Sequence, residues 1–162
     1  MTIRRGIPLL LLAAVLATLP VPSRAAGSEV VVTEEVQLRV ADAFLSEGEY
    51  YRAITEYKKF LFLFPDSERA DLALFRVGTA YYRGEEYEPA ARTFASVQEK
   101  HGKGSYAAPA AYFEGISLWK LGMFDRAEAA LDRVPALDPN SEYAPLSRIG
   151  KSLLAFDGKD IP

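Results

Sequence analysis

The sequence predicts an all-α fold, a solenoid of helix–turn–helix repeats. A motif with an aromatic residue and, three residues later, an alanine recurs at a constant interval at Ala53, Ala90 and Ala127. Before each motif lies a second apolar pattern of helical period, and a Pro- or Gly-containing junction follows it. Self-similarity at a period of 20–50 residues is typical of repeat architectures, in which neighbouring units bury one another's apolar faces.

The first helix of each unit is predicted from an apolar pattern that ends on a glycine. The three patterns are LRVADAFLSEG (38–48), ALFRVGTAYYRG (73–84) and AYFEGISLWKLG (111–122). Because glycine is the usual residue just after a helix end, we expect Gly48, Gly84 and Gly122 to be C-cap residues.

The second helix of the first unit is predicted to include the apolar run FLFLF (60–64). Ile54, Tyr57, Leu61 and Phe64 recur at helical spacing, which argues against a strand. Pro65 ends the helix, and burial on two sides would explain the apolar run.

Three junctions align without gaps, and each offers polar or small residues as helix N-caps. The candidates are Asp66 or Ser67, Gly104 or Ser105, and Asn140 or Ser141. The sequence therefore predicts repeats at about 34–66, 67–103 and 104–140, and a capping helix at 141–156. This repeat domain spans 33–157, after a short linker at 26–32 and before a tail at 158–162.

Residues 1–25 have the pattern of a secretory signal peptide: an arginine pair, an apolar stretch too short to span a bilayer comfortably, and small residues before Ala25. Cleavage near Ala25 would leave an exported chain, most simply a bacterial periplasmic one; an uncleaved N-terminal anchor is the alternative. Membrane contact is otherwise expected to be indirect.

The composition excludes several kinds of site. The chain has no cysteine and one histidine, so cysteine-ligated zinc, thiol nucleophiles and two-histidine metal sites are ruled out. A net charge of −3 argues against nucleic-acid binding. His101 lies in a glycine-rich turn, and Glu114 is the one acidic residue at a core position. We therefore expect no enzymatic activity, no catalytic residue, no metal and no cofactor.

The repeats resemble the tetratricopeptide repeat, whose consensus has small, aromatic, alanine, aromatic and proline positions. The first unit has Ala41, Phe44, Ala53, Tyr57 and Pro65 there. The second has Gly78, Tyr81, Ala90 and Phe94, with Gly102 in place of proline; the third has Gly115, Leu118, Ala127, Leu131 and Pro139. The junctions are similar to those of bacterial envelope members, such as the lipoprotein BamD and periplasmic cell-division coordinators, although the lipid-anchoring cysteine of BamD is absent.

The resemblance implies a right-handed superhelix whose first helices line a concave groove. Aromatic residues flanked by Arg83 and Lys120 on these helices favour an extended or helical peptide, especially an acidic one. The family positions fall on Leu38, Asp42, Phe75, Thr79, Tyr82, Arg83, Tyr112, Ile116, Trp119 and Lys120. The resulting hypothesis is a non-enzymatic periplasmic scaffold that binds a protein partner during outer-membrane or cell-wall assembly. Two alternatives remain: a glycan-binding accessory module of a cell-wall enzyme, and a self-assembling, homo-oligomeric module that stacks through an open C-terminal face. The chain could also be the front part of a longer protein.

Overall fold

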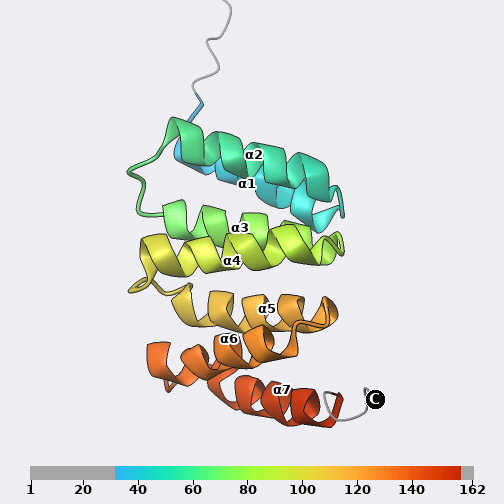
Figure 1. Ribbon diagram of the computed structural model, residues 1–162. Coiled ribbons are helices and arrows are strands. Elements are labelled where there is room, and N and C mark those ends of the chain that lie inside the picture. The colour runs from blue at the N-terminus through green and yellow to red at the C-terminus, as the bar shows by residue number, and fades with distance from the viewer. Residues whose placement is uncertain (1–31, 158–162) are drawn as a thin grey trace, which may run out of the picture. The chain divides into compact units, whose positions relative to one another are not determined.

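The computed structural model describes residues 32–157, which form a stack of α-helices with no strand among them (Figure 1). The helices of this region are α1 (Glu34–Ser46), α2 (Tyr50–Leu63), α3 (Ala70–Arg83), α4 (Tyr87–His101), α5 (Ala107–Lys120), α6 (Phe124–Leu137) and α7 (Tyr143–Asp157). The predicted all-α repeat solenoid is confirmed. The signal-peptide and tail predictions fall outside the described residues.

The helices pack in chain order as three antiparallel pairs, α1/α2, α3/α4 and α5/α6, followed by α7. Figure 1 shows the pairs stacked one after another, with each helix next to the one that follows it. The last helix packs against both α6 and α5. Within residues 32–157, no helix has the length and apolarity needed to cross a membrane.

Small residues set the spacing between the helices of each pair. Ala53, Ala90 and Ala127 have no exposed surface, as expected for positions where helices cross closely. A methyl group added at Gly78 would come within 2.6 Å of the Phe94 ring. Close packing of this kind leaves no room for larger side chains at these crossings.

Of the three glycines predicted as C-cap residues, Gly84 is the C-cap of α3, whereas Gly48 and Gly122 lie one residue beyond the C-caps of α1 and α5. Gly48 and Gly122 have φ angles of +80° and +72°, the left-handed conformation that closes a helix. At the end of α3, Gly84 instead has a φ of −79°, and Glu85 adopts the left-handed conformation with a φ of +61°. Glu85 lies one repeat interval from both of the other glycines, so register, rather than glycine content, decides which residue closes the helix.

The predicted N-caps of α3 and α5 were wrong by one to three residues. Arg69 and Tyr106 stand at these positions, and neither caps the helix with its side chain. Ser67 instead accepts a hydrogen bond from the Arg69 backbone N–H at 3.1 Å, and Ser141 does the same for Tyr143 at 3.3 Å. The serines thus form short turns that precede the helices.

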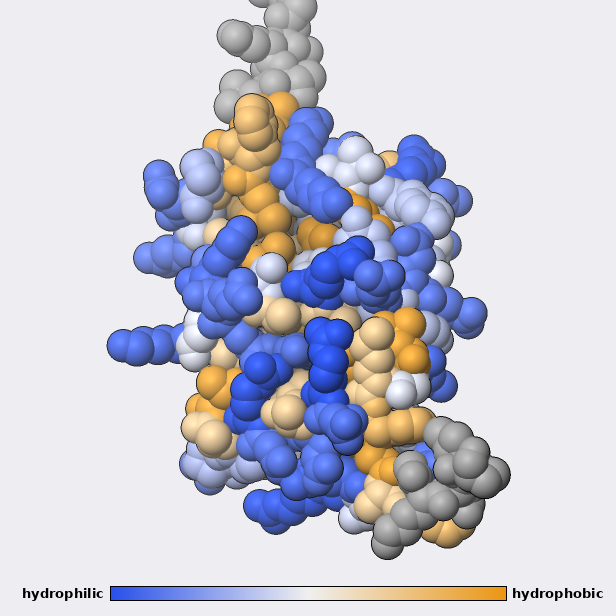
Figure 2. Space-filling view, viewed as in Figure 1, coloured by the Kyte–Doolittle hydropathy of each residue, from blue (hydrophilic) through white to orange (hydrophobic). Residues whose placement is uncertain are grey.

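The run FLFLF is helical up to Leu63, as predicted for the end of the second helix, but Phe64 is the C-cap residue and lies just outside it. Phe60 is fully buried, but Phe62 is 84% exposed, so burial does not account for the whole run. Two residues along a helix rotate a side chain by about 200°, which places Phe62 on the outside. Figure 2 shows that the side on which α2 and α4 lie in Figure 1 is otherwise mainly hydrophilic.

Glu114 of α5 is 8% exposed and lies at a core position. Its carboxylate accepts hydrogen bonds from Gln98 of α4 at 2.7 Å and from Arg133 of α6 at 2.6 Å. The acidic side chain is therefore paired and hydrogen-bonded, which is the condition for keeping a carboxylate inside a protein.

Candidate functional site

The side chains predicted to line the groove lie on the first helix of each pair. They are Leu38 and Asp42 on α1; Phe75, Thr79, Tyr82 and Arg83 on α3; and Tyr112, Ile116, Trp119 and Lys120 on α5. The structure brings those of α3 and α5 together through a cluster of aromatic rings and separates them from Leu38.

Phe113 is the centre of this cluster. Its ring centroid lies 6.0 Å from that of Phe75, 5.5 Å from Tyr82, 5.4 Å from Tyr112 and 5.8 Å from Tyr143. All five side chains are partly buried. Aromatic rings at these separations attract one another, so the cluster holds α3, α5 and α7 in a fixed relation.

Phe113 was not among the groove residues predicted from the sequence. One repeat earlier the same register position holds Arg76, and a family position with no recurring aromatic residue gives no periodic signal. Its position next to Tyr112, on a helix otherwise rich in small residues, was the one local feature that could have indicated an aromatic contact.

On α3, Phe75 and Tyr82 have further aromatic neighbours. The Phe75 ring stacks on Tyr106 at 5.1 Å, and the Tyr82 ring meets the edge of Tyr87 at 5.7 Å. The Thr79 hydroxyl donates to the carbonyl of Phe75 at 3.0 Å. The wall of α3 is therefore pre-ordered, which lowers the entropic cost of binding at this surface.

On α5, the predicted residues are joined to α7. The ring of Tyr112 lies 5.3 Å from that of Tyr143, and the Trp119 indole N–H donates to Asp157 at 3.0 Å. Ile116 and Trp119 also pack against a buried cluster that includes Leu154. The surface formed by α5 thus continues directly onto α7.

The α1 end of the row is different. Leu38 is 6% exposed and belongs to the core between α1 and α2, so it offers almost no surface to a ligand. Asp42 is exposed and accepts a hydrogen bond from the Tyr57 hydroxyl. Burial raises the pKa of Tyr57, and Asp42 raises it further, while the nearby Arg76 and Arg83 act in the opposite direction. Polar and charged groups therefore gather at this end.

Burial also raises the pKa values of Tyr82 and Tyr112, and of Tyr143 on α7. All three hydroxyls are therefore neutral at physiological pH. A neutral tyrosine presents a large apolar ring with one hydrogen-bonding group, a combination enriched at interfaces.

Two cations lie at the C-terminal ends of the same helices. Arg83 ends α3 and Lys120 ends α5, and both are exposed. Among residues 32–157, neither forms an ion pair. We call the surface formed by Phe75, Tyr82, Arg83, Tyr112, Phe113, Ile116, Trp119 and Lys120 the aromatic row.

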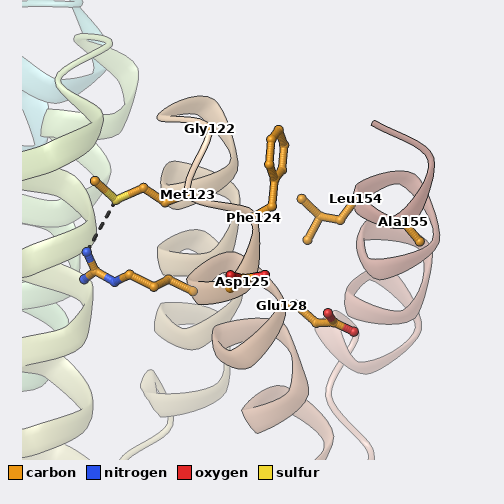
Figure 3. Close-up of a pocket in the computed structure, with 8 residues that line it drawn as sticks. Gly122, Met123, Phe124, Asp125, Glu128, Leu154 and Ala155 are labelled. Carbon is orange, nitrogen blue, oxygen red and sulfur yellow. Dashed lines mark hydrogen bonds between the residues drawn. The ribbon is translucent and has the colours of Figure 1, made fainter. Parts of the chain in front are cut away.

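A separate notch lies between the start of α6 and the second half of α7 (Figure 3). The Leu154 side chain points toward Phe124, and Asp125 and Glu128 of α6 also line the notch. Within the described part of the chain, no group of His, Asp or Glu residues is arranged to hold a metal ion.

One repeat of the chain matches the model of a known protein family. Residues 72–103 match the model of the tetratricopeptide repeat. This match supports the resemblance of the repeats to the tetratricopeptide repeat family. A search of curated proteins finds no match.

Solved structures show the same fold at low sequence identity. The second TPR domain of human RPAP3, in complex with an HSP70 peptide, is 20% identical; the match covers 76% of this chain and 98% of that one, with a TM-score of 0.60. The first TPR of Spaghetti (RPAP3), bound to an HSP90 peptide, is also 20% identical, with coverages of 75% and 93% and a TM-score of 0.61. The Sgt2 TPR domain from Aspergillus fumigatus is 18% identical, with coverages of 78% and 80% and a TM-score of 0.65.

Proposed function

We propose that this chain is a non-enzymatic scaffold that binds a peptide segment of another protein on the aromatic row. The observation that carries the proposal is the row itself: partly buried aromatic rings on α3 and α5, with the exposed cations Arg83 and Lys120 at its edge. Aromatic anchors next to exposed cations favour a partner with apolar and acidic side chains.

The structural neighbours support a peptide as the ligand. The human RPAP3 domain is in complex with the HSP70 peptide SGPTIEEVD, and the Spaghetti domain is bound to the HSP90 peptide SRMEEVD. Both peptides are acidic, which agrees with the cations here. Because a shared fold does not imply a shared partner, the crosslinking experiment below is designed to identify the bound protein.

The proposed place of action is the bacterial periplasm, with residues 1–25 as the export signal. The junctions that resemble those of bacterial envelope proteins favour a partner in outer-membrane or cell-wall assembly. Export can be tested independently of binding, because N-terminal sequencing of the protein from the periplasmic fraction should begin at or near Ala26.

Site-specific photo-crosslinking in the producing cell tests the binding surface. Position 83 belongs to the aromatic row and is exposed, so a reactive residue in place of Arg83 should give a discrete band containing one partner protein. The matched control is Arg92 of α4, also exposed but paired with Glu88 away from the row. A band from Arg83 alone, identified by mass, supports the proposal.

Equal bands from Arg83 and Arg92, or none from either, would overturn it. A glycan ligand gives a different result: no protein band, and a change in Trp119 fluorescence with cell-wall fragments but not with acidic peptides. The fluorescence is specific because Trp119 is the single tryptophan of the chain.

A further inference from the structure

An exposed apolar stripe runs along α7. Ile149, Leu153 and Phe156 are 57%, 48% and 71% exposed, although all three are large hydrophobic side chains. Their spacing of four and three residues places them on one face of the helix. A contiguous apolar stripe of this kind on a soluble domain marks an interaction surface more often than scattered single residues do.

The repeat register identifies this stripe as a continuation of the aromatic row. One repeat interval separates Ile149 from Tyr112, Leu153 from Ile116, and Phe156 from Trp119. The contacts agree with the register, because Trp119 bonds to Asp157, the neighbour of Phe156 in the chain. The stripe therefore extends the surface that α3 and α5 already form.

In α3 and α5, one side packs against the second helix of the pair. The equivalent side of α7 is polar. Where α3 and α5 have Gly78 and Gly115 packed against the second helix of their pair, α7 has Ser152, which is exposed. Arg148, beside it, is exposed too, and Lys151 pairs with Glu128 and Asp132 of α6. This side is thus suited to water, and the stripe is the apolar surface that α7 leaves open.

The extended surface is graded along the stack. Its α1–α3 end has Asp42, Thr79, Arg76 and Arg83, whereas its α5–α7 end is mainly aromatic or aliphatic, with Lys120 and Asp157 at its edge. Lys120 is the last cation before the stripe begins. Charge complementarity therefore favours acidic ligand groups near the cations, and burial of apolar area favours apolar ligand groups near the stripe.

We propose that α7 is the fourth wall of the groove and binds the apolar end of the partner segment. The occupant is an extended segment of another protein with acidic residues over Arg83 and Lys120 and two or three large apolar side chains over Ile149, Leu153 and Phe156. This inference rests on the proposed function and adds the composition and polarity of the ligand.

Four synthetic peptides test the inference, with binding followed through the fluorescence of Trp119. The first has the sequence Asp-Glu-Asp-Gly-Leu-Phe-Leu, and the second has the same residues in reverse order, because the chain direction of the ligand is not assumed. The other two replace the apolar half by Ser-Thr-Ser in each order. One of the first two peptides should bind at least about tenfold more tightly than its serine counterpart, which corresponds to ~1.4 kcal/mol.

The matched variants separate α7 from the rest of the groove. The double variant Ile149→Gln, Leu153→Gln should weaken the apolar peptide about tenfold and leave the serine peptide unchanged. Arg148→Gln, on the polar side of the same helix, should change neither. All three positions are exposed, so circular dichroism should show unchanged thermal unfolding. Tyr82→Ala should weaken both peptides, because its ring belongs to the aromatic row.

The outcomes distinguish the inference from the proposed function. If peptides bind and Tyr82→Ala weakens them, but the α7 double variant does not, the inference is overturned while the groove stands. If no peptide binds, both fail. If sedimentation shows that the wild type self-associates and the double variant does not, a second copy covers the stripe, and the inference is again overturned.

Discussion

The second and third helix pairs, α3/α4 and α5/α6, place different chemistry at the same positions. Val77 of α3 is 1% exposed and lies near Leu61 and Ser96. One repeat interval later the equivalent of Val77 is Glu114, which is 8% exposed.

The two neighbours change together with this residue. Gln98 stands at the register position of Leu61, and Arg133 at that of Ser96, and both donate hydrogen bonds to Glu114. A buried acid is thus tolerated because the previous and the current second helix each supply a donor. A repeat position is therefore defined by the residue together with its two contacts on the neighbouring second helices, and not by the residue type alone.

The largest expected effect probes the core that both pairs share. Phe94→Ala should destabilise the domain by about 3–5 kcal/mol, and Leu131→Ala by about 2–5 kcal/mol, because each removes a fully buried side chain packed against a glycine. Urea denaturation with a two-state fit measures both. A loss below about 1 kcal/mol for Phe94→Ala would contradict the packing described for Gly78.

The next prediction tests the polar contacts directly. Arg133→Ala should cost on the order of 2 kcal/mol, because Glu114 keeps only one of its two donors inside the core. Glu114→Leu should be neutral or stabilising, since it removes a buried carboxylate while its partner Arg133 is half exposed and stays solvated. Denaturation curves of the two variants provide the comparison.

The double variant is the control for this prediction. In the Glu114→Leu background, Arg133→Ala should have little effect, because Arg133 is half exposed and has lost its acidic partner. An equal cost of Arg133→Ala in both backgrounds would mean that the arginine stabilises α6 by packing alone.

The smallest expected effect concerns the ends of α3 and α5. Glu85→Gly should stabilise the domain by about 1 kcal/mol, because it removes a side chain from a left-handed backbone position. Gly122→Ala, at the equivalent position after α5, should destabilise it by a similar amount. Thermal unfolding of the two variants should show shifts of the melting temperature with opposite signs. Shifts of the same sign would contradict the equivalence of the two positions.

Much of the fold could be predicted because repetition multiplies weak local signals. The alanine positions and the helical spacing each occur three times, so the all-α solenoid followed from the pattern alone. Helix ends were less predictable. Gly84 seemed the equivalent of Gly48 by residue type, yet Glu85 is its equivalent by position.

The candidate surface was predictable only in part. Register places Phe75 of α3 and Tyr112 of α5 at equivalent positions, but exposure depends on what covers each residue. Leu38 of α1 occupies the same register position and is buried. Phe113, which joins the rings together, breaks the repeat pattern and could be found only from its contacts.

The sequence by itself determined the class of fold, the interval of the repeat and the small residues at the helix crossings, because these follow from local periodicity and side-chain size. Only the tertiary structure decided which apolar residues are exposed. The stripe of Ile149, Leu153 and Phe156 has the spacing of an ordinary buried helix face. It faces solvent because α7 packs on α5 and α6 through its other residues, and burial is a property of neighbours rather than of sequence.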